Sequence, residues 1–344
     1  MKRISVLLLV LALSGCETLA YYAQAVGGHL DLWTRARPVE ELLADAQTPA
    51  VLRERLALAQ SVREFASRQL GLPDNGSYRS YAELDRPYAV WNVVTAPEFS
   101  LQAVESCFPV AGCVTYRGFF SREDAQRYAA QARARGLDAF VYGVPAYSTL
   151  GAFDDPLLST FTRWGDAELA RLVFHELAHQ LLYVKGDTAF NESFAVVVER
   201  EGVRRWLASA GRSAELAKFQ QTREREREFS RLLDQTRARL EPLYRMHIAP
   251  GEMRERKRAE FERLAADTVY RRHAGGYVDG PSNALLAAFA SYSQLVPAFE
   301  RVLAQSGGDL KTFYATVEAL AKLDKTERAR RLEAQLSGIS TTLR

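Results

Sequence analysis

The chain has 344 residues, and its 45 Lys and Arg against 42 Asp and Glu leave a formal net charge of +3. This near balance excludes the strongly basic composition typical of nucleic-acid-binding proteins, and 47% hydrophobic residues are ordinary for a globular protein. The length allows one large domain or two small ones, and no Pro- or Gly-rich linker or internal repeat divides the chain.

The N-terminus has the pattern of a bacterial export signal. Lys2 and Arg3 precede the apolar run 4–13, which is too short to span a bilayer as a helix. Residues 13–16, LSGC, resemble the lipobox of bacterial lipoproteins, which implies a signal peptide over residues 1–15 and a lipid attached to Cys16. Because Glu17 is not the Asp of an inner-membrane retention signal, we expect an outer-membrane lipoprotein that faces the periplasm. A plain secretory signal with an incidental cysteine is the alternative.

The next part of the chain predicts helices and a small sheet. Apolar spacing predicts a helix over Val39–Gln69. Three strand-like runs begin between Tyr88 and Tyr116: YAVWNVV, SLQAV and GCVTYRG. Ser121–Gly136 predicts a helix that Ser121 caps and Gly136 ends, and Ala139–Val144 predicts a further strand. Tyr147–Gly151 is a candidate edge strand for binding a substrate backbone, with a buried strand and turn as the alternative.

Two cysteines lie close together in this region. Cys107 and Cys113 are predicted to form a disulfide, because an exported protein is in an oxidising compartment. Two free buried thiols are the alternative. A thiolate metal site is disfavoured, because no Cys or His lies beside them at ligand spacing.

From Asp166 onward the chain is predicted to be helical. Asp166 is the expected N-cap of an apolar helix, and Lys185-Gly186 its expected end. A second charged helical stretch, Arg212–Arg272, has apolar residues three and four apart and a break at Pro250-Gly251, so it predicts a long helical hairpin. Its charges are expected to face solvent, although the hairpin is also a candidate cover for an active site.

The apolar helix carries the run HELAHQ. His175 and His179 are four residues apart and therefore share one helix face, where two imidazoles can bind a single metal ion. Glu176 then lies beside the open metal position as a general base for a bound water. The alternative is a core helix whose histidines are hydrogen-bonded, but burying two histidines and a glutamate is costly without such partners.

A third ligand is expected on the following helix. Asp187 and Thr188 are predicted to cap it, and the short turn makes the two helices antiparallel neighbours. Glu192 then faces the His179 end of the first helix. Two histidines and one carboxylate leave a fourth tetrahedral position for water, which is the catalytic rather than the structural arrangement of zinc. An ordinary surface acid is the alternative.

HELAHQ followed by NESFA resembles the gluzincin peptidases, the thermolysin-like and alanyl-aminopeptidase-like enzymes. The resemblance implies one Zn²⁺ held by His175, His179 and Glu192, although the spacing in this chain is shorter. Thermolysin-like enzymes have an Asp where this chain has Val196, so the partner that orients a ligand is unassigned, with Glu199 as the candidate.

The chain is also similar to a bacterial family of aminopeptidase lipoproteins. The similarity extends over nearly everything after residue 20. It rests on five segments: YYAQAVGGHLDLW from Tyr21, FPVAGCVTYRGFF from Phe108, AYSTLGAFDDPLLST from Ala146, FHELAHQLLYVKGDTAFNESFA from Phe174 and YSQLVPAFERVL from Tyr292. One departure is Ala152, where we expect an aromatic residue.

These resemblances imply a mostly helical α+β fold, in which residues 16–344 form a single zincin-like peptidase domain with a small sheet before the HExxH helix. The implied activity is zinc-dependent hydrolysis of peptide bonds, with a peptide as the substrate. The candidates for the donor to the oxyanion are Tyr292, Tyr277 and His273, and Asn283 is a candidate for positioning substrate.

An aminopeptidase also needs a carboxylate for the free α-amino group, and the candidates are Asp154 and Asp155, unless DDP simply forms a turn. The alternative function is a cell-envelope scaffold or assembly factor with a structural or vestigial metal. An intact Glu176 favours the enzyme, because a structural site has no use for a general base.

Overall fold

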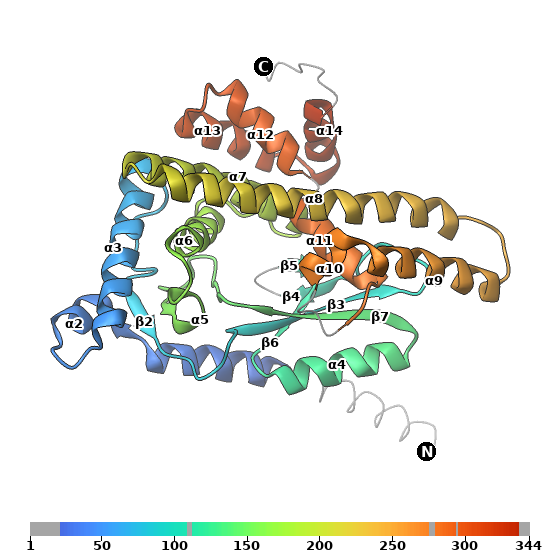
Figure 1. The fold of residues 1–344 in the computed structure, drawn as a ribbon, viewed down its shortest axis with the longest axis horizontal. Coiled ribbons are helices and arrows are strands. Elements are labelled where there is room, and N and C mark those ends of the chain that lie inside the picture. Colours follow the sequence, from blue (N-terminus) through green and yellow to red (C-terminus); the bar gives the residue numbers. More distant parts are fainter. Residues whose placement is uncertain (1–20, 109–111, 275–278, 294, 337–344) are drawn as a thin grey trace, which may run out of the picture.

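The computed structural model describes residues 21–108, 112–274, 279–293 and 295–336 (Figure 1). Residues 21–35 are helical. The further helices are α2 (Val39–Ala44), α3 (Ala50–Leu70), α4 (Arg122–Ala134), α5 (Ser159–Thr162), α6 (Asp166–Leu181), α7 (Thr188–Ser209), α8 (Ser213–Tyr244), α9 (Pro250–Ala266), α10 (Thr268–Ala274), α11 (Asn283–Ser293), α12 (Val296–Gln305), α13 (Leu310–Ala321) and α14 (Lys325–Leu336). The mostly helical α+β architecture is therefore as predicted. None of the described helices has the length and apolarity to cross a bilayer.

The strands are short and form three small sheets. They are β1 (Arg37–Pro38), β2 (Ser80–Ala82), β3 (Val90–Pro97), β4 (Ser106–Phe108), β5 (Gly112–Val114), β6 (Arg117–Phe119), β7 (Leu137–Val144) and β8 (Leu157–Leu158). The order in the largest sheet is β6-β3-β7, and β3 pairs antiparallel with β7 along its whole length, from Val90 opposite Val144 to Pro97 opposite Leu137.

Helices cover both faces of this sheet (Figure 1). Val93 of β3 packs with Ala125 and Ala129 of α4 on one face. Val94 and Phe140 pack on the other face, with residues of α8, α9 and α11. Burial on both sides explains why β3 is mostly apolar without strict alternation, with Asn92 and Thr95 also buried in it.

Two sequence predictions about these elements need correction, and a third is confirmed. Val39–Gln69 is two helices, because Pro49 disfavours helical backbone in the residue before it and α3 begins only afterwards. SLQAV is not a strand; the N–H of Ser100 donates to the carbonyl of Pro97, so a turn follows β3 directly. The helix after Ser121 is confirmed, with the Ser121 hydroxyl accepting from the N–H of Asp124 at 3.2 Å.

Helices α6 and α7 lie side by side and are joined by residues 182–187. Asp187 caps α7 as predicted, since its carboxylate accepts from the N–H of Phe190 at 3.2 Å. Asp166 does not cap α6; the N-cap is Gly165, and Asp166 pairs instead with Arg55 and Arg212. Helix α6 ends at Leu181, earlier than the predicted stop at Lys185-Gly186.

The hairpin predicted for Arg212–Arg272 is confirmed as α8 and α9. Pro250 is the first residue of α9 rather than a break within it, a position where proline costs no backbone hydrogen bond. Its charges do not all face solvent: the guanidinium of Arg223 is buried and pairs with Glu168 of α6 at 2.6 Å. Helices α12 to α14 lie on the side of α7 that faces away from α6 and the sheet (Figure 1).

Candidate functional site

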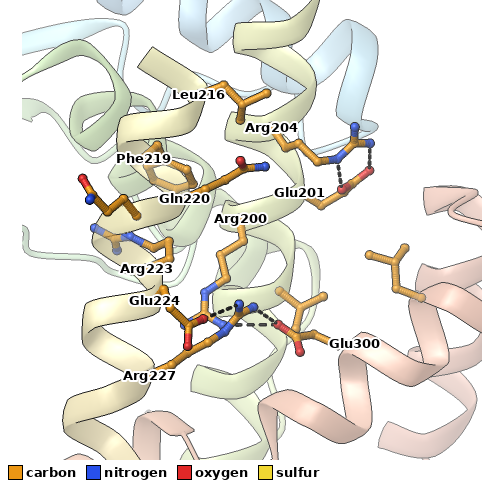
Figure 2. A pocket seen from close by; sticks show the side chains of 13 residues that line it. Arg200, Glu201, Arg204, Leu216, Phe219, Gln220, Arg223, Glu224, Arg227 and Glu300 are labelled. Carbon is orange, nitrogen blue, oxygen red and sulfur yellow. Dashed lines mark hydrogen bonds and ion pairs between the residues drawn. The ribbon is translucent and has the colours of Figure 1, made fainter. Parts of the chain in front are cut away.

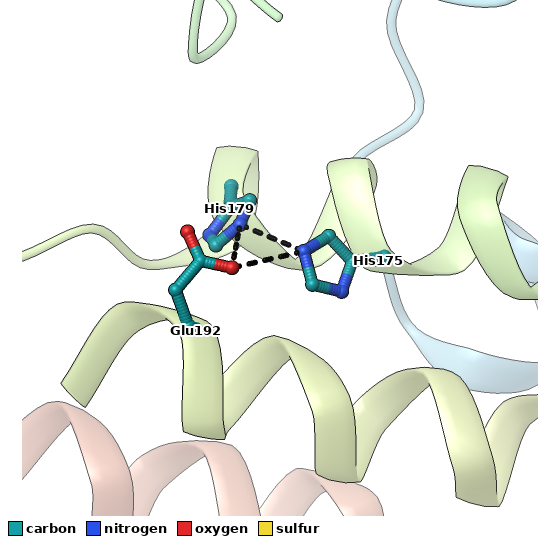
Figure 3. Close-up of side chains that lie close together, drawn as sticks. All are labelled: His175, His179 and Glu192. Carbon is teal, nitrogen blue, oxygen red and sulfur yellow. Dashed lines mark hydrogen bonds and ion pairs between the residues drawn. The ribbon is translucent and has the colours of Figure 1, made fainter. Parts of the chain in front are cut away.

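Three potential metal ligands converge between α6 and α7 (Figure 3). The Nε2 atoms of His175 and His179 are 3.1 Å apart. Glu192 Oε2 lies 3.3 Å from His175 Nε2 and 3.7 Å from His179 Nε2. Each of the three residues is at most 9% exposed. The local helix geometry thus brings together the three residues that the sequence singles out.

The charge state of the group shows how strongly these side chains interact. Burial lowers the pKa of His175, but hydrogen bonds and charges from Glu192 and Glu199 outweigh burial and raise this pKa to about 10. Burial raises the pKa of Glu192, whereas His179 and His175 lower it, and the result is about 2. In the protein without a metal ion, the protonated imidazole of His175 therefore neutralises the buried carboxylate of Glu192.

The donor set fits a divalent cation. Two imidazole nitrogens and one carboxylate oxygen face a common point, and all three atoms lie within 4.8 Å of one another. Nitrogen and oxygen ligands in this number are those of catalytic zinc sites. A cation at that point would bind the two imidazole nitrogens and the carboxylate oxygen, which without it are held together by a shared proton.

Glu199 orients the first histidine. Its Oε2 lies 2.9 Å from His175 Nδ1 and 2.9 Å from the guanidinium of Arg171. Burial raises the pKa of Glu199, but Arg171 foremost and then His175 lower it to about 2, so it is a carboxylate. This holds a proton on Nδ1 of His175 and turns Nε2 toward Glu192, the arrangement that orients metal-binding histidines in proteins. Glu199 is thus the partner that orients a ligand, the role for which it was the sequence candidate because Val196 cannot perform it.

A cavity of about 320 Å³ is lined by His175, His179 and Glu192. Glu176 lines it, one residue after His175, and the structure records no hydrogen-bond or ion-pair partner for its carboxylate among the described residues. The cavity wall is completed by the end of β7 and the residues after it, by β5 and β6, and by the helix of residues 21–35. A carboxylate without a protein partner beside a metal group is available to accept a proton.

Two tyrosines of the cavity were missed at the sequence level. Tyr116 follows β5, and burial and the neighbouring Glu192 carboxylate raise its pKa well above the ordinary value. Tyr183 follows α6, its ring 6.2 Å from that of His179, and the same two causes raise its pKa. Both remain neutral hydroxyl donors at physiological pH. No periodic signal marks either residue, because each enters the site from a loop.

The predicted oxyanion donors are placed differently. His273 stacks on Phe229 in the packing around α8 and does not line the cavity. Tyr277 and the side chain of Tyr292 lie outside the described residues. Asn283 binds Tyr244 and the carbonyl groups of residues 97 and 98, so it holds α11 against the sheet rather than facing a substrate.

Asn191, which precedes the ligand Glu192, has a structural role. Its side-chain amide accepts from the N–H of Val184 at 2.7 Å and donates to the carbonyl of the same residue at 2.8 Å. This pair of bonds closes the loop between α6 and α7 although α6 stops early. The Asn of the NE pair thus holds the connection that places Glu192 opposite the histidines.

Tyr147–Gly151 is not an edge strand; it is an irregular segment that ends in a turn at Leu150 and Gly151, and Asp155 holds it by hydrogen bonds. The carboxylate of Asp155 accepts from the N–H and the hydroxyl of Thr149, at 2.9 and 2.8 Å. Asp155 is 2% exposed and does not line the cavity, while Asp154 is exposed. Neither residue lines the cavity, so the prediction that they bind a substrate amine is not supported, and DDP itself follows the turn at Leu150 and Gly151 rather than forming it. Ala152 lies on the exposed tip of the same loop, outside the cavity lining.

Two of the three cysteines lie within the described residues. Cys107 and Cys113 form a disulfide between the paired strands β4 and β5. The next residue, Val114, lines the cavity, so this bond closes the hairpin that leads to Tyr116. Cys16 lies outside the described residues.

A second cavity, of about 560 Å³, lies between α7, α8 and α12 (Figure 2). Its charged residues are largely paired with one another: Arg200 and Arg227 both bind Glu300, and Arg204 binds Glu201. No described metal-binding group opens onto it. Because the charges of this second cavity are largely paired with one another and it contains none of the convergent residues His175, His179 and Glu192, the other cavity is the better candidate site.

Comparison with known proteins identifies the family. The model of the family described as "Putative aminopeptidase" matches residues 20–332, and the chain belongs to this family. No curated protein and no solved structure matches the chain.

Proposed function

We propose that this member of the aminopeptidase family is a zinc-dependent peptidase that cleaves the N-terminal residue from peptides. The observation that carries the proposal is the carboxylate of Glu176, which has no partner among the described residues and lies in a cavity that also contains the convergent atoms of His175, His179 and Glu192. A structural metal site is closed and needs no such carboxylate. The match to the aminopeptidase family supports the same chemistry.

His175, His179 and Glu192 would hold the ion. When bound, Zn²⁺ lowers the pKa of a water molecule and polarises a carbonyl group. The protein's own contribution begins with Glu199, which keeps the Nε2 lone pair of His175 directed at the site. It continues with Asn191, whose bonds to Val184 hold Glu192 in reach of both histidines.

Glu176 performs the proton transfers. Its carboxylate takes a proton from the attacking water while the water oxygen forms a bond to the scissile carbonyl carbon. The same proton then passes to the leaving amine as the carbon–nitrogen bond breaks. One peptide and one water yield one carboxylate and one ammonium group, because the second proton of the water also ends on the amine.

Tyr116 is the proposed donor to the oxyanion. It lies in the cavity with Glu176 and Glu192, and its raised pKa keeps the hydroxyl proton in place to donate. A donor held at the point where negative charge develops stabilises the transition state more than the substrate. Tyr183 lines the same cavity beside His179 and is the second phenol in reach.

A single assay tests both the metal dependence and the preference for free N-termini. Matched peptides with free and with N-acetylated termini are offered to the protein before chelation, after chelation and after zinc is restored. We expect cleavage of the free peptide only, loss of activity on chelation and its recovery with zinc. Equal cleavage of both peptides would make the enzyme an endopeptidase, and activity that survives complete zinc removal would refute the proposed chemistry.

A further inference from the structure

The helix of residues 21–35 has two different faces. Its inner face belongs to the catalytic region: Tyr21 and Ala25 line the cavity, and Leu32 is 1% exposed. The contact is close, since a Cβ at Gly28 would fall 2.1 Å from the ring of Phe120. The helix is therefore packed against the rest of the protein and lies along the edge of the molecule (Figure 1, deep blue).

The outer face of this helix carries an exposed apolar stripe, whereas its exposed charged residue, Arg35, lies at the end of the helix and pairs with Asp31. The exposed residues from 22 to 34 are Tyr22, Ala23, Val26, Gly27, Leu30, Trp33 and Thr34. The large ones are spaced four, four and three apart, so they form one stripe. Tyr22 is 38%, Val26 58%, Leu30 50% and Trp33 43% exposed.

The stripe continues onto a neighbouring loop. Phe153 is 44% exposed, and its ring centroid lies 4.7 Å from that of Trp33. Elsewhere in the described chain the exposed large apolar residues, Val51, Val104 and Met246, are on separate elements. Single apolar side chains on a surface are normal, whereas a joined group marks an interaction site.

We propose that this stripe lies in the interface of a lipid bilayer. The stripe begins at Tyr22, six residues after Cys16, the lipidation position predicted from the sequence. Six residues of extended chain span at most about 21 Å. A lipid anchor there brings the stripe to the membrane surface. Trp and Tyr favour the membrane–water boundary, and an apolar helix face lies about 5–10 Å into it, adding a second attachment to a single anchor.

This placement has a consequence for the enzyme, and it goes beyond the proposed peptidase function. The inner face of the helix lines the catalytic cavity, so a helix lying flat on the bilayer holds that cavity beside the membrane surface. Peptides would then be cleaved close to the membrane. The contact needs no anionic lipid, because the stripe has no charge.

Trp33 reports on the contact directly. The full-length protein, processed in a bacterial host, is reconstituted with phosphatidylcholine vesicles whose acyl chains are brominated. Subtracting the fluorescence of a Trp33→Phe variant isolates Trp33 from the other three of the four tryptophans. We expect the brominated lipid to remove most of the Trp33 signal and aqueous iodide to leave it.

Paired substitutions test the stripe itself. Leu30→Glu together with Val26→Glu should abolish quenching by the lipid, whereas Met246→Glu, an equally exposed site on another face, should not. Cleavage of a soluble peptide should be unchanged in all variants, which separates this inference from the peptidase proposal. Quenching of Trp33 by iodide in vesicles would overturn the inference. So would protection from both quenchers, which would indicate a second copy of the chain on the stripe.

Discussion

At the scale of single residues, the site is a chain of hydrogen bonds that ends at the candidate metal ligands. Arg171 binds Glu199, and Glu199 binds His175. Glu199 is seven residues after Glu192, two helical turns along, so both carboxylates project from the same face of α7 toward α6. Its function is to position a ligand rather than to touch substrate.

Glu199→Gln should therefore weaken zinc binding without removing a ligand. We expect roughly 10- to 100-fold lower zinc affinity, because the neutral amide no longer fixes the proton on His175 Nδ1. Competition with a chromophoric chelator measures this affinity, and activity at saturating zinc should largely recover. A variant with unchanged affinity would show that Glu199 contributes only to packing.

Tyr116→Phe removes only the proposed donor to the oxyanion. We expect kcat to fall by about 100- to 1,000-fold, the range for loss of such a donor. KM and zinc content should change little, because the ring still fills the same space. Tyr183→Phe is the matched comparison, and a larger loss of kcat there would transfer the role to Tyr183.

At the scale of elements, local spacing made part of the site predictable. His175, His179 and Glu176 follow from one helix, and Glu192 follows from a short turn between two helices. Tyr116 could not be predicted in this way, because it reaches the site through the pairing of strands distant in sequence. Tyr147–Gly151 has a strand-like pattern, but Asp155 supplies hydrogen bonds that stabilise a turn.

Asp155 also gives this turn a pH dependence. Burial raises its pKa from 3.8 to about 6, against hydrogen bonds from Thr149 that lower it. The folded state therefore holds the proton more tightly than the unfolded chain, and the carboxyl group costs stability as pH rises from about 4 through 6. The cost above pH 6 is roughly 3 kcal/mol at 1.36 kcal/mol per pKa unit.

Replacing Asp155 by Asn should remove this dependence. Relative to the wild type, the unfolding free energy of the metal-free variant should rise by roughly 3 kcal/mol between pH 4 and pH 7. Denaturant titrations of both metal-free proteins at the two pH values measure the difference. A difference that stays constant or falls with pH would contradict the assignment.

At the scale of the whole molecule, the fold class was predictable but the arrangement was not. The hairpin of α8 and α9 is evident from its apolar spacing, yet no described residue of it lines the cavity that contains Glu176. It is instead joined to α6 through Arg223 and Glu168. Such long-range ion pairs follow from the packing of distant elements, which no local pattern encodes.

The central claim is that metal binding and catalysis reside in separate residues of one cavity. Glu176→Gln and His175→Ala separate them, when zinc content and peptide turnover are measured on the same preparations. We expect Glu176→Gln to retain one zinc and lose about 100- to 10,000-fold in kcat, because only the proton acceptor is removed. His175→Ala should lose both zinc and activity. Full turnover by Glu176→Gln with its zinc in place would contradict the account.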